Sequence, residues 1–220
     1  MKHHTAAIEA FTEVVGSVGG TLKEKLVAGK GVYCRAILPE EKCVQPKDAL
    51  KPGVALRANL RTLQVVPYVF RILCSNGALW THSATAFSME TDEGTTARDI
   101  EEFVRDSTVT AASAESFQSC LQEIRAGRNT PADHLLSIVA SIRSAARELD
   151  RMLLDLVLAA IARSEEPETR YDAMNVVTAA ARDVPDPELK WKLEALATRL
   201  LIRSVRDARE RTGFLVAQTA

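Results

Sequence analysis

Residues 54–77 read VALRANLRTLQVVPYVFRILCSNG, and this stretch decides the fold. Apolar residues alternate with polar or small ones over 54–61, which predicts a strand with one buried face and two arginines on the other. Residues 65–74 are apolar on both faces except for one arginine, which predicts a central strand. Asn76-Gly77 predicts a hairpin turn, because both central residues of a type I′ turn need positive φ. The stretch therefore predicts an antiparallel sheet.

The pattern on the N-terminal side predicts two further kinds of element. Residues 6–18 have apolar side chains at helical spacing, and residues 21–28 read as one or two further helical turns. Residues 32–38 alternate as a strand does and end before a proline. Residues 46–53 read as a loop, and residues 78–88 as the strand that returns after the hairpin turn. The predicted sheet thus covers about residues 32–88.

The period becomes helical on the C-terminal side of the sheet. Helices are predicted over residues 97–105 and 113–125, followed by a long one over 131–164. At about 1.5 Å per residue this long helix would extend roughly 50 Å. Two more helices are predicted, from residue 167 to 182 and from residue 186 to about 212. The helices are expected to pack on the sheet and on one another, so the predicted fold class is α+β.

The domain organisation is predicted from a change of composition near residue 97. The first part is rich in Val, Gly and Pro, and the second in Ala, Leu, Arg and Glu. We therefore expect residues 1–96 to form the N-terminal helix and the sheet, and residues 97–220 to form a helical region. The two parts are expected to make one continuous domain.

Net charge and apolar runs exclude several classes of protein. The 220 residues carry a net charge of −1, so the whole chain is not a polycation that coats nucleic acid. No secretory signal follows the N-terminus, and the most apolar stretch, 152–161, is too short to cross a membrane. The four cysteines are not paired at short spacings, which favours reduced thiols and a cytoplasmic protein.

Enzymatic motifs are absent from the sequence. There is no phosphate-binding glycine loop, no dinucleotide fingerprint and no zinc-protease motif, so we expect no cofactor, no metal and no catalytic residues. Cys74 with His82 as its base is the alternative that would make the chain a hydrolase. We expect Cys74 to be a structural residue at the end of a strand instead. The sequence favours a non-enzymatic protein.

One long segment without acidic residues is the candidate binding surface. No Asp or Glu occurs from Ala49 to Met89. Arginines on the exposed face of a sheet grip phosphates and neighbouring aromatic rings stack on bases, a combination typical of nucleic-acid binding. The predicted nucleic-acid-binding residues are Arg57, Arg61, Arg71, Trp80 and Tyr68. The alternative interpretation is that buried strands simply avoid carboxylates.

Three short segments resemble an uncharacterised prokaryotic family carried largely by phages and plasmids, known as domain of unknown function 932. Residues 71–78, RILCSNGA, resemble the family's strand that ends in Arg-Val-Val-Cys-x-Asn. Residues 33–39 resemble an earlier strand that ends in Leu-Pro, and residues 169–178 resemble a later helix. The resemblance covers about residues 31–200, and residues 56–61 stand where the family often has a His-Asp-Gly element. It implies a mobile-element context.

Two functions follow as hypotheses. The first is a non-enzymatic nucleic-acid-binding protein of a phage or plasmid, with single-stranded nucleic acid as its partner. The second is a structural or interaction protein that self-assembles and has no role in nucleic-acid binding. A helix over 131–164 is too long for a compact domain whose radius of gyration is roughly 17 Å. The sequence therefore also predicts a homo-oligomer formed through the long helices.

Overall fold

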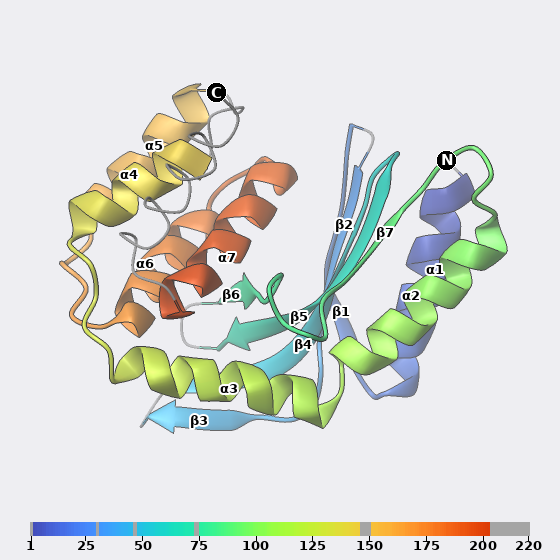
Figure 1. Ribbon diagram of the computed structural model, residues 1–220, viewed down its shortest axis with the longest axis horizontal. Coiled ribbons are helices and arrows are strands. Elements are labelled where there is room, and N and C mark those ends of the chain that lie inside the picture. Colours follow the sequence, from blue (N-terminus) through green and yellow to red (C-terminus); the bar gives the residue numbers. More distant parts are fainter. Residues whose placement is uncertain (1, 30, 46–47, 73–74, 146–150, 203–220) are drawn as a thin grey trace, which may run out of the picture. The chain divides into compact units, whose positions relative to one another are not determined.

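The structure is a computed structural model, and it describes all residues except 1, 30, 46–47, 73–74, 146–150 and 203–220 (Figure 1). The chain divides into two compact units, Met1–Leu121 and Gln122–Ala220. This boundary lies later than the composition change near residue 97. It falls within helix α3 (Ala114–Arg128).

The first unit contains a seven-stranded antiparallel sheet and two helices. The helices are α1 (Lys2–Ser17) and α2 (Ala97–Ala111). The strands are β1 (Thr21–Ala28), β2 (Gly31–Ile37), β3 (Lys42–Gln45), β4 (Asp48–Ala58), β5 (Thr62–Arg71), β6 (Asn76–Leu79) and β7 (Phe87–Glu90). Their order is β1-β2-β4-β5-β6, with β3 also paired to β4 and β7 also paired to β5. The sheet and the helices confirm the predicted α+β class.

Prolines mark the points where the two central strands change partners. β4 pairs with β3 up to Leu50 and with β2 from Gly53, and Pro52 lies between the two partners. The carbonyl oxygen of Pro52 accepts from the backbone N–H of Leu38 at 2.8 Å. The N–H and C=O of one residue point to the same side of a strand, so the N–H that proline lacks would point to the side where β4 changes from β3 to β2. A proline interrupts no ladder hydrogen bond at such a break.

Pro67 plays the same part in β5. It lies between the residues that pair with β7, which end at Val65, and those that pair with β6, which begin at Tyr68. Its carbonyl oxygen accepts from the N–H of Trp80 at 3.0 Å. β4 and β5 are therefore long central strands, and each is flanked by two shorter strands placed end to end.

The apolar core of the first unit lies between one face of the sheet and helices α1 and α2. Side chains from β2, β4 and β5 on this face are fully buried with those of the two helices, as Figure 1 shows for the layers. The amphipathic helix predicted over residues 6–18 is thereby confirmed. Its Phe11 is one of the largest fully buried side chains. Helix α2 begins at a capping box formed by Thr96 and Asp99.

The helical prediction for residues 21–28 is wrong, because this segment is strand β1. Leu22 and Leu26 have helical spacing, but each is only half-buried and alternates with exposed neighbours. Gly29 has a φ of 55°, which closes a tight hairpin between Ala28 and Gly31. Long-range pairing with β2 therefore overrides the local signal.

Two predicted turns also lie elsewhere. The loop predicted over 46–53 is wrong from Asp48 onward, because Asp48–Gly53 belong to β4 and pair with β3 and β5. Asn76-Gly77 does not form the hairpin turn but lies inside β6, where Arg71 pairs with Asn76. The connection from β5 to β6 runs over residues 72–75, and the predicted return strand is split into β6 and β7. The predicted place of Cys74 lies outside the described residues.

The second unit is helical. Its helices are α4 (Leu135–Ala145), α5 (Arg151–Ala162), α6 (Arg170–Arg182) and α7 (Pro187–Ile202). Helix α6 packs on α7, and α5 packs on α6. The start predicted for the last helix is confirmed, because the Asp186 carboxylate accepts from the N–H of Leu189 at 2.7 Å as an N-cap.

The single long helix predicted over 131–164 is wrong. Helices α4 and α5 contact each other. Ala145 and Arg151 would be about 9 Å apart along the axis of one straight helix, so its two halves would have no such contacts. A short antiparallel ladder holds the start of the segment: the N–H of Arg170 donates to the carbonyl of Thr130 at 2.9 Å, and that of Ala132 to Glu168 at 3.0 Å. This ladder keeps the backbone extended where the helix was expected to begin.

Helices that could cross a membrane are absent from the described part of the chain. None of the helices there combines the length and the apolar character that a membrane span requires.

Candidate functional site

The five predicted nucleic-acid-binding residues do not form one exposed surface. Arg71 makes an ion pair in which its Nε donates to Asp48 Oδ1 at 2.6 Å. Asp48 is 1 % exposed and lies across the β4–β5 ladder near Arg71, because Leu50 pairs directly with Arg71. The charge of Arg71 is thus matched by a buried carboxylate from just outside the acid-free segment.

The two predicted aromatic residues are buried. Trp80 is 1 % exposed and Tyr68 is 4 % exposed. The ring of Tyr68 lies against the backbone of Gly77, and a Cβ built on Gly77 would collide with that ring. A Cβ on Gly53, directly opposite Tyr68 on β4, would collide with the carbonyl oxygen of Ala36 and come within 3.0 Å of the Tyr68 ring. The structure therefore gives Tyr68 a packing role.

The remaining two arginines differ from each other. Arg57 is half-buried at the end of β4, and its Nη1 donates to Gln64 Oε1 at 3.2 Å across the ladder. Arg61 is exposed, but it lies in the turn after β4 and not on the same strand face as Arg57, so this predicted alignment is wrong. The Asn59 side chain shapes the turn by accepting from the N–H of Arg61 at 2.9 Å. The nucleic-acid role of all five residues stays a prediction.

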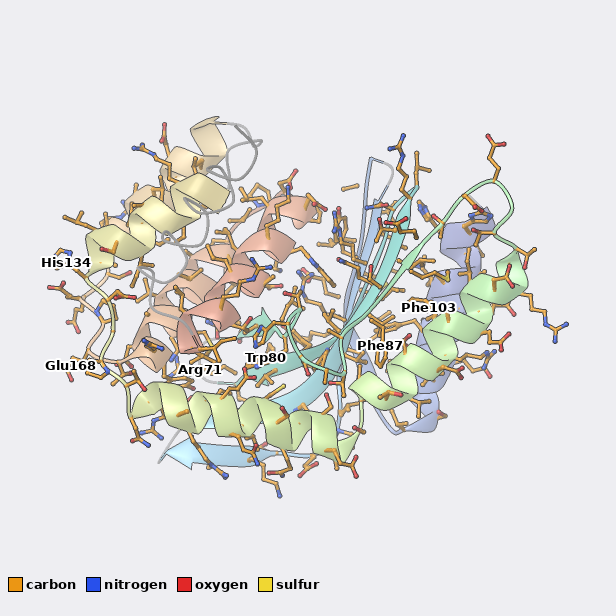
Figure 2. All side chains as sticks on the ribbon, viewed as in Figure 1. Arg71, Trp80, Phe87, Phe103, His134 and Glu168 are labelled. Carbon is orange, nitrogen blue, oxygen red and sulfur yellow. The ribbon has the colours of Figure 1, made fainter. Side chains whose placement is uncertain are left out.

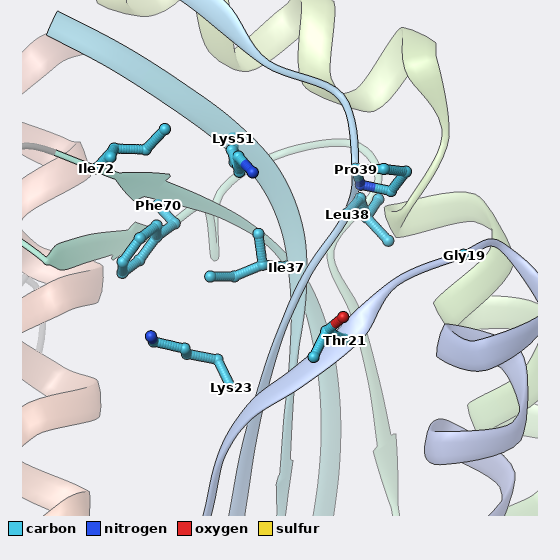
Figure 3. Close-up of a pocket in the computed structure, with 9 residues that line it drawn as sticks. All are labelled: Gly19, Thr21, Lys23, Ile37, Leu38, Pro39, Lys51, Phe70 and Ile72. Atoms are coloured by element: carbon cyan, nitrogen blue, oxygen red, sulfur yellow. The ribbon is translucent and has the colours of Figure 1, made fainter.

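A cavity of about 410 Å³ opens where β1 begins and β2 and β5 end (Figure 3). This volume is in the range of small-molecule sites. Five apolar side chains line it: Ile37, Leu38, Pro39, Phe70 and Ile72. The polar part of the lining comes from Thr21, Lys23 and Lys51, together with the backbone at Gly19.

The cavity lies on the sheet face opposite α1 and α2. Residues directly opposite each other in a ladder share a face, and Lys51 pairs with Phe70. Lys51 and Val54 are an odd number of residues apart on β4, so their side chains lie on opposite faces of the sheet. Val54 belongs to the core beneath the helices. Thr21 pairs with Ile37 on this outer face. Four strands, β1, β2, β4 and β5, therefore contribute to one cavity.

Two lysines bring positive charge to this cavity without a matching carboxylate. Figure 3 shows Lys23 and Lys51 entering from different strands, with Ile37 and Phe70 between them in this view. The Lys23 Nζ is 5.6 Å from the centre of the Phe70 ring, a cation–π distance. None of the described lining residues is acidic, and within the described part of the chain neither lysine has an ion-pair partner. The arrangement can hold an anionic group beside an apolar one.

Neither lysine of this cavity is among the site residues predicted from the sequence. Lys51 lies in the acid-free segment, which was a usable signal. Lys23 lies in the stretch predicted as helix. Its side chain lies on the outer face with that of Thr21, two residues earlier, because alternate residues of a strand share a face. This alternation applies only once the segment is a strand, and pairing with β2 decides that.

The cysteines do not form a metal site in the part of the chain that the structure describes, where no group of His, Cys, Asp and Glu could hold an ion. Cys34, Cys43 and Cys120 are there as thiols and not as disulfides. Burial in the core beneath α1 raises the pKa of the Cys34 thiol to about 11, and the nearby Lys25 ammonium opposes this shift only weakly. Cys34 is therefore an inert core residue. The predictions for Cys74 lie outside the described residues.

The second unit carries a smaller cavity of about 290 Å³ between α5 and the end of α6. Most of its lining is apolar, and one wall is Leu156, which is 63 % exposed. Leu136 on α4 is 71 % exposed. These two are the most exposed large apolar side chains of the described helices, and they bear on the predicted assembly.

Comparison with known proteins gives no relative for this chain: no family model, no curated protein and no solved structure matches it. The resemblance to the phage- and plasmid-borne family stays a prediction. The geometry of the chain itself is therefore the basis of the proposed function.

Proposed function

We propose that this chain is a non-enzymatic binding protein whose ligand is an organic anion with an apolar part. The supporting observation is the cavity at the start of β1, where Lys23 and Lys51 face an apolar lining that contains no acidic residue among those described. Sites of this kind orient a ligand with a few polar groups and obtain much of their affinity from apolar contact. The anionic group lies at the two ammonium groups, and the apolar part packs on Ile37 and Phe70.

Charge complementarity accounts for selectivity at this site. A hydrogen bond between an ammonium and an anion contributes about 1.5–3 kcal/mol. Each lysine therefore changes affinity by roughly tenfold or more. A neutral analogue of the same shape keeps only the apolar contact.

The test uses three small probes that share a phenyl ring. Phenyl phosphate and phenylacetate are anions, and 2-phenylethanol is neutral. Calorimetric titration of the wild-type chain is expected to show binding of both anions and at least tenfold weaker binding of the alcohol. Lys23→Gln combined with Lys51→Gln should weaken the anions at least tenfold and leave the alcohol unchanged.

Lys42→Gln is the matched control. Lys42 is an exposed lysine of the same unit, and its Nζ makes an ion pair with Glu40 at 3.1 Å away from the cavity lining. This variant should bind all three probes as the wild type does. If the wild type binds neither anion at millimolar concentration, or if the double variant binds them unchanged, the proposal is wrong.

Single-stranded nucleic acid, the partner predicted from the sequence, is a second proposal. It is supported by the exposed Arg61 and by the absence of acidic residues from Ala49 to Met89. The test is binding of short poly-dT and of duplex DNA across a salt series. Binding that does not weaken with salt would contradict contacts to phosphates.

Self-assembly through the helical unit is the alternative to both. It is supported by the exposed Leu136 and Leu156, one on each helix of the α4–α5 pair. Light scattering at tens of micromolar should detect an oligomer that Leu136→Glu with Leu156→Glu dissociates. A wild type that is monomeric under these conditions would exclude this function.

A further inference from the structure

The outer edge of β1 is a row of backbone groups that another strand could use. Among the described residues β1 pairs only with β2. All eight of its residues are exposed or half-buried. Val27 is 68 % exposed and is the most exposed large apolar side chain of the first unit among the residues described. Such an edge can take up an extended segment through main-chain hydrogen bonds.

The charges on β1 favour an acidic segment. Glu24 is neutralised from within the sheet, because Arg35 Nη1 donates to its Oε2 at 2.6 Å and the Arg35 side chain is 1 % exposed. Lys23 and Lys25 have no ion-pair partner within the described part of the chain. The edge strand therefore presents two ammonium groups and no uncompensated carboxylate.

The two lysines lie on opposite faces of the strand. Lys25 pairs with Cys34, which belongs to the core face beneath α1. Lys23 extends over the Phe70 ring on the other face, at the mouth of the cavity. Consecutive residues of an added strand also point to opposite faces. Two adjacent acidic residues can therefore reach both lysines at once.

We infer that β1 is a docking edge for an extended acidic segment of another protein, which adds to the sheet as a further strand with its carboxylates at Lys23 and Lys25. The inference rests on the proposed function, because Lys23 belongs to both sites and the docked segment supplies the anion beside the cavity. Main-chain pairing gives affinity, and the two lysines give selectivity for acidic sequences.

A second copy of this chain fits the same edge less well. Antiparallel self-pairing centred on Glu24 places Glu24 opposite its own copy, and like charges directly opposite each other are destabilising. The bulge between Leu22 and Glu24 also interrupts the flat edge that two identical strands would need. A partner of opposite charge has neither disadvantage.

Val27 offers a way to block the edge without touching the cavity. In a two-residue hairpin the closing pair, here Ala28 and Gly31, is hydrogen-bonded, and the next pair is not. The N–H of Val27 therefore points away from β2 toward the free edge. Val27→Pro removes this donor and leaves the bonds to β2 in place. Val27→Thr keeps the donor and the β-branched shape, so it is the matched control.

The experiment measures fluorescence anisotropy of three labelled peptides: acetyl-Val-Thr-Glu-Glu-Val-Val-amide and its versions with Lys-Lys or Gln-Gln in place of Glu-Glu. The acidic peptide is expected to bind the wild type at least tenfold more tightly than the other two. Val27→Pro should weaken it at least tenfold, whereas Val27→Thr should not. Lys23→Glu with Lys25→Glu, which keeps the strand backbone, should reverse the preference toward the Lys-Lys peptide.

Phenyl phosphate separates this inference from the proposed function. Val27→Pro should bind phenyl phosphate as the wild type does, which also shows that the variant is folded. Equal binding of the acidic peptide by Val27→Pro and wild type would overturn the docking edge and leave the cavity proposal standing. A wild-type dimer that Val27→Pro dissociates, together with no binding of the acidic peptide, would assign the edge to a second copy and overturn the inference.

Discussion

The two lysines at the cavity and the arginines of the β4–β5 pair differ in what faces their charge. Arg71 has the buried Asp48 carboxylate at 2.6 Å, and Arg57 has the Gln64 side chain across the ladder. Lys23 and Lys51 have apolar neighbours and no ion-pair partner within the described residues. Two arginines of the acid-free segment are thus matched across the ladder, whereas Arg61 is exposed in the turn and the two lysines line a cavity.

This difference shows that a count of charges along a segment does not locate a binding surface. Asp48 lies one residue before the acid-free segment, and it comes beside Arg71 because β4 and β5 are antiparallel. Lys23 and Lys51 lie on strands that are not adjacent in the sheet order, and they line one cavity because both side chains lie on the outer face of the sheet. Register and ladder direction decide which charges are matched.

The largest expected effect tests the matched side of this comparison. Asp48→Ala leaves the guanidinium of Arg71 without its buried carboxylate, which should lower the free energy of unfolding by about 3 kcal/mol. Urea denaturation followed by circular dichroism measures this change. Asp48→Ala combined with Arg71→Met should recover a large part of the loss. A loss below about 1 kcal/mol in the single variant would mean that the pair contributes little.

The second prediction tests whether Tyr68 is a packing residue or a stacking platform. Gly77→Ala should destabilise the first unit by about 2 kcal/mol, because the new methyl group collides with the Tyr68 ring. Gly16→Ala, with nothing near its Cβ and a position inside α1, should instead stabilise by about 0.5–1 kcal/mol. The measurement is thermal and urea unfolding of both variants. A neutral Gly77→Ala would show that the ring moves freely.

The third prediction concerns the helix-covered face of the sheet, where the buried Cys34 thiol should make folding stability depend on pH. Burial holds the pKa of the Cys34 thiol at about 11, above its ordinary value of 9.0. The unfolded chain therefore loses this proton at lower pH than the folded chain does, and folding stability falls as pH rises from about 9 to about 11. Below pH 9 the contribution is fully present.

Cys34→Ala should lack this loss. The difference in unfolding free energy between wild type and variant, from urea midpoints at several pH values, is expected to shrink above pH 9. Parallel pH profiles for the two proteins would show that Cys34 is not closed off beneath α1. Cys43, which is exposed, should react with a thiol reagent at pH 8 in the folded protein, whereas Cys34 should not.

The smallest expected effect concerns the exposed arginine. Arg61→Ala should change the free energy of unfolding by less than about 0.5 kcal/mol, because the side chain is exposed in a turn. Arg57→Ala, which loses a cross-strand hydrogen bond, should cost about 1 kcal/mol. If poly-dT binds, Arg61→Ala should reduce the salt slope by about one unit. A substantial loss of stability in Arg61→Ala would place its side chain in a contact that the turn does not provide.

The local part of this structure could be predicted from the sequence. Helix α1, strand β2, the central position of β5 and the start of α7 each follow from a period, a capping residue or a proline within a few positions. The boundaries of β4 and the turn after β5 could not, because β3 and β6 fix them from elsewhere in the chain. Helix α4 begins later than its local signals indicate, because residues near 130 and 170 pair with each other.

The sequence by itself determined the α+β class, the main strands and helices, and the shortage of carboxylates from Ala49 to Met89, since these depend on neighbours in the chain. Tertiary structure alone decided that β1 is an edge strand, that Asp48 matches Arg71 and that Lys23 and Lys51 line one cavity. The physical reason is that a charge is matched or accessible according to what lies within a few ångströms of it. In this chain those neighbours are brought there by antiparallel pairing across more than twenty residues.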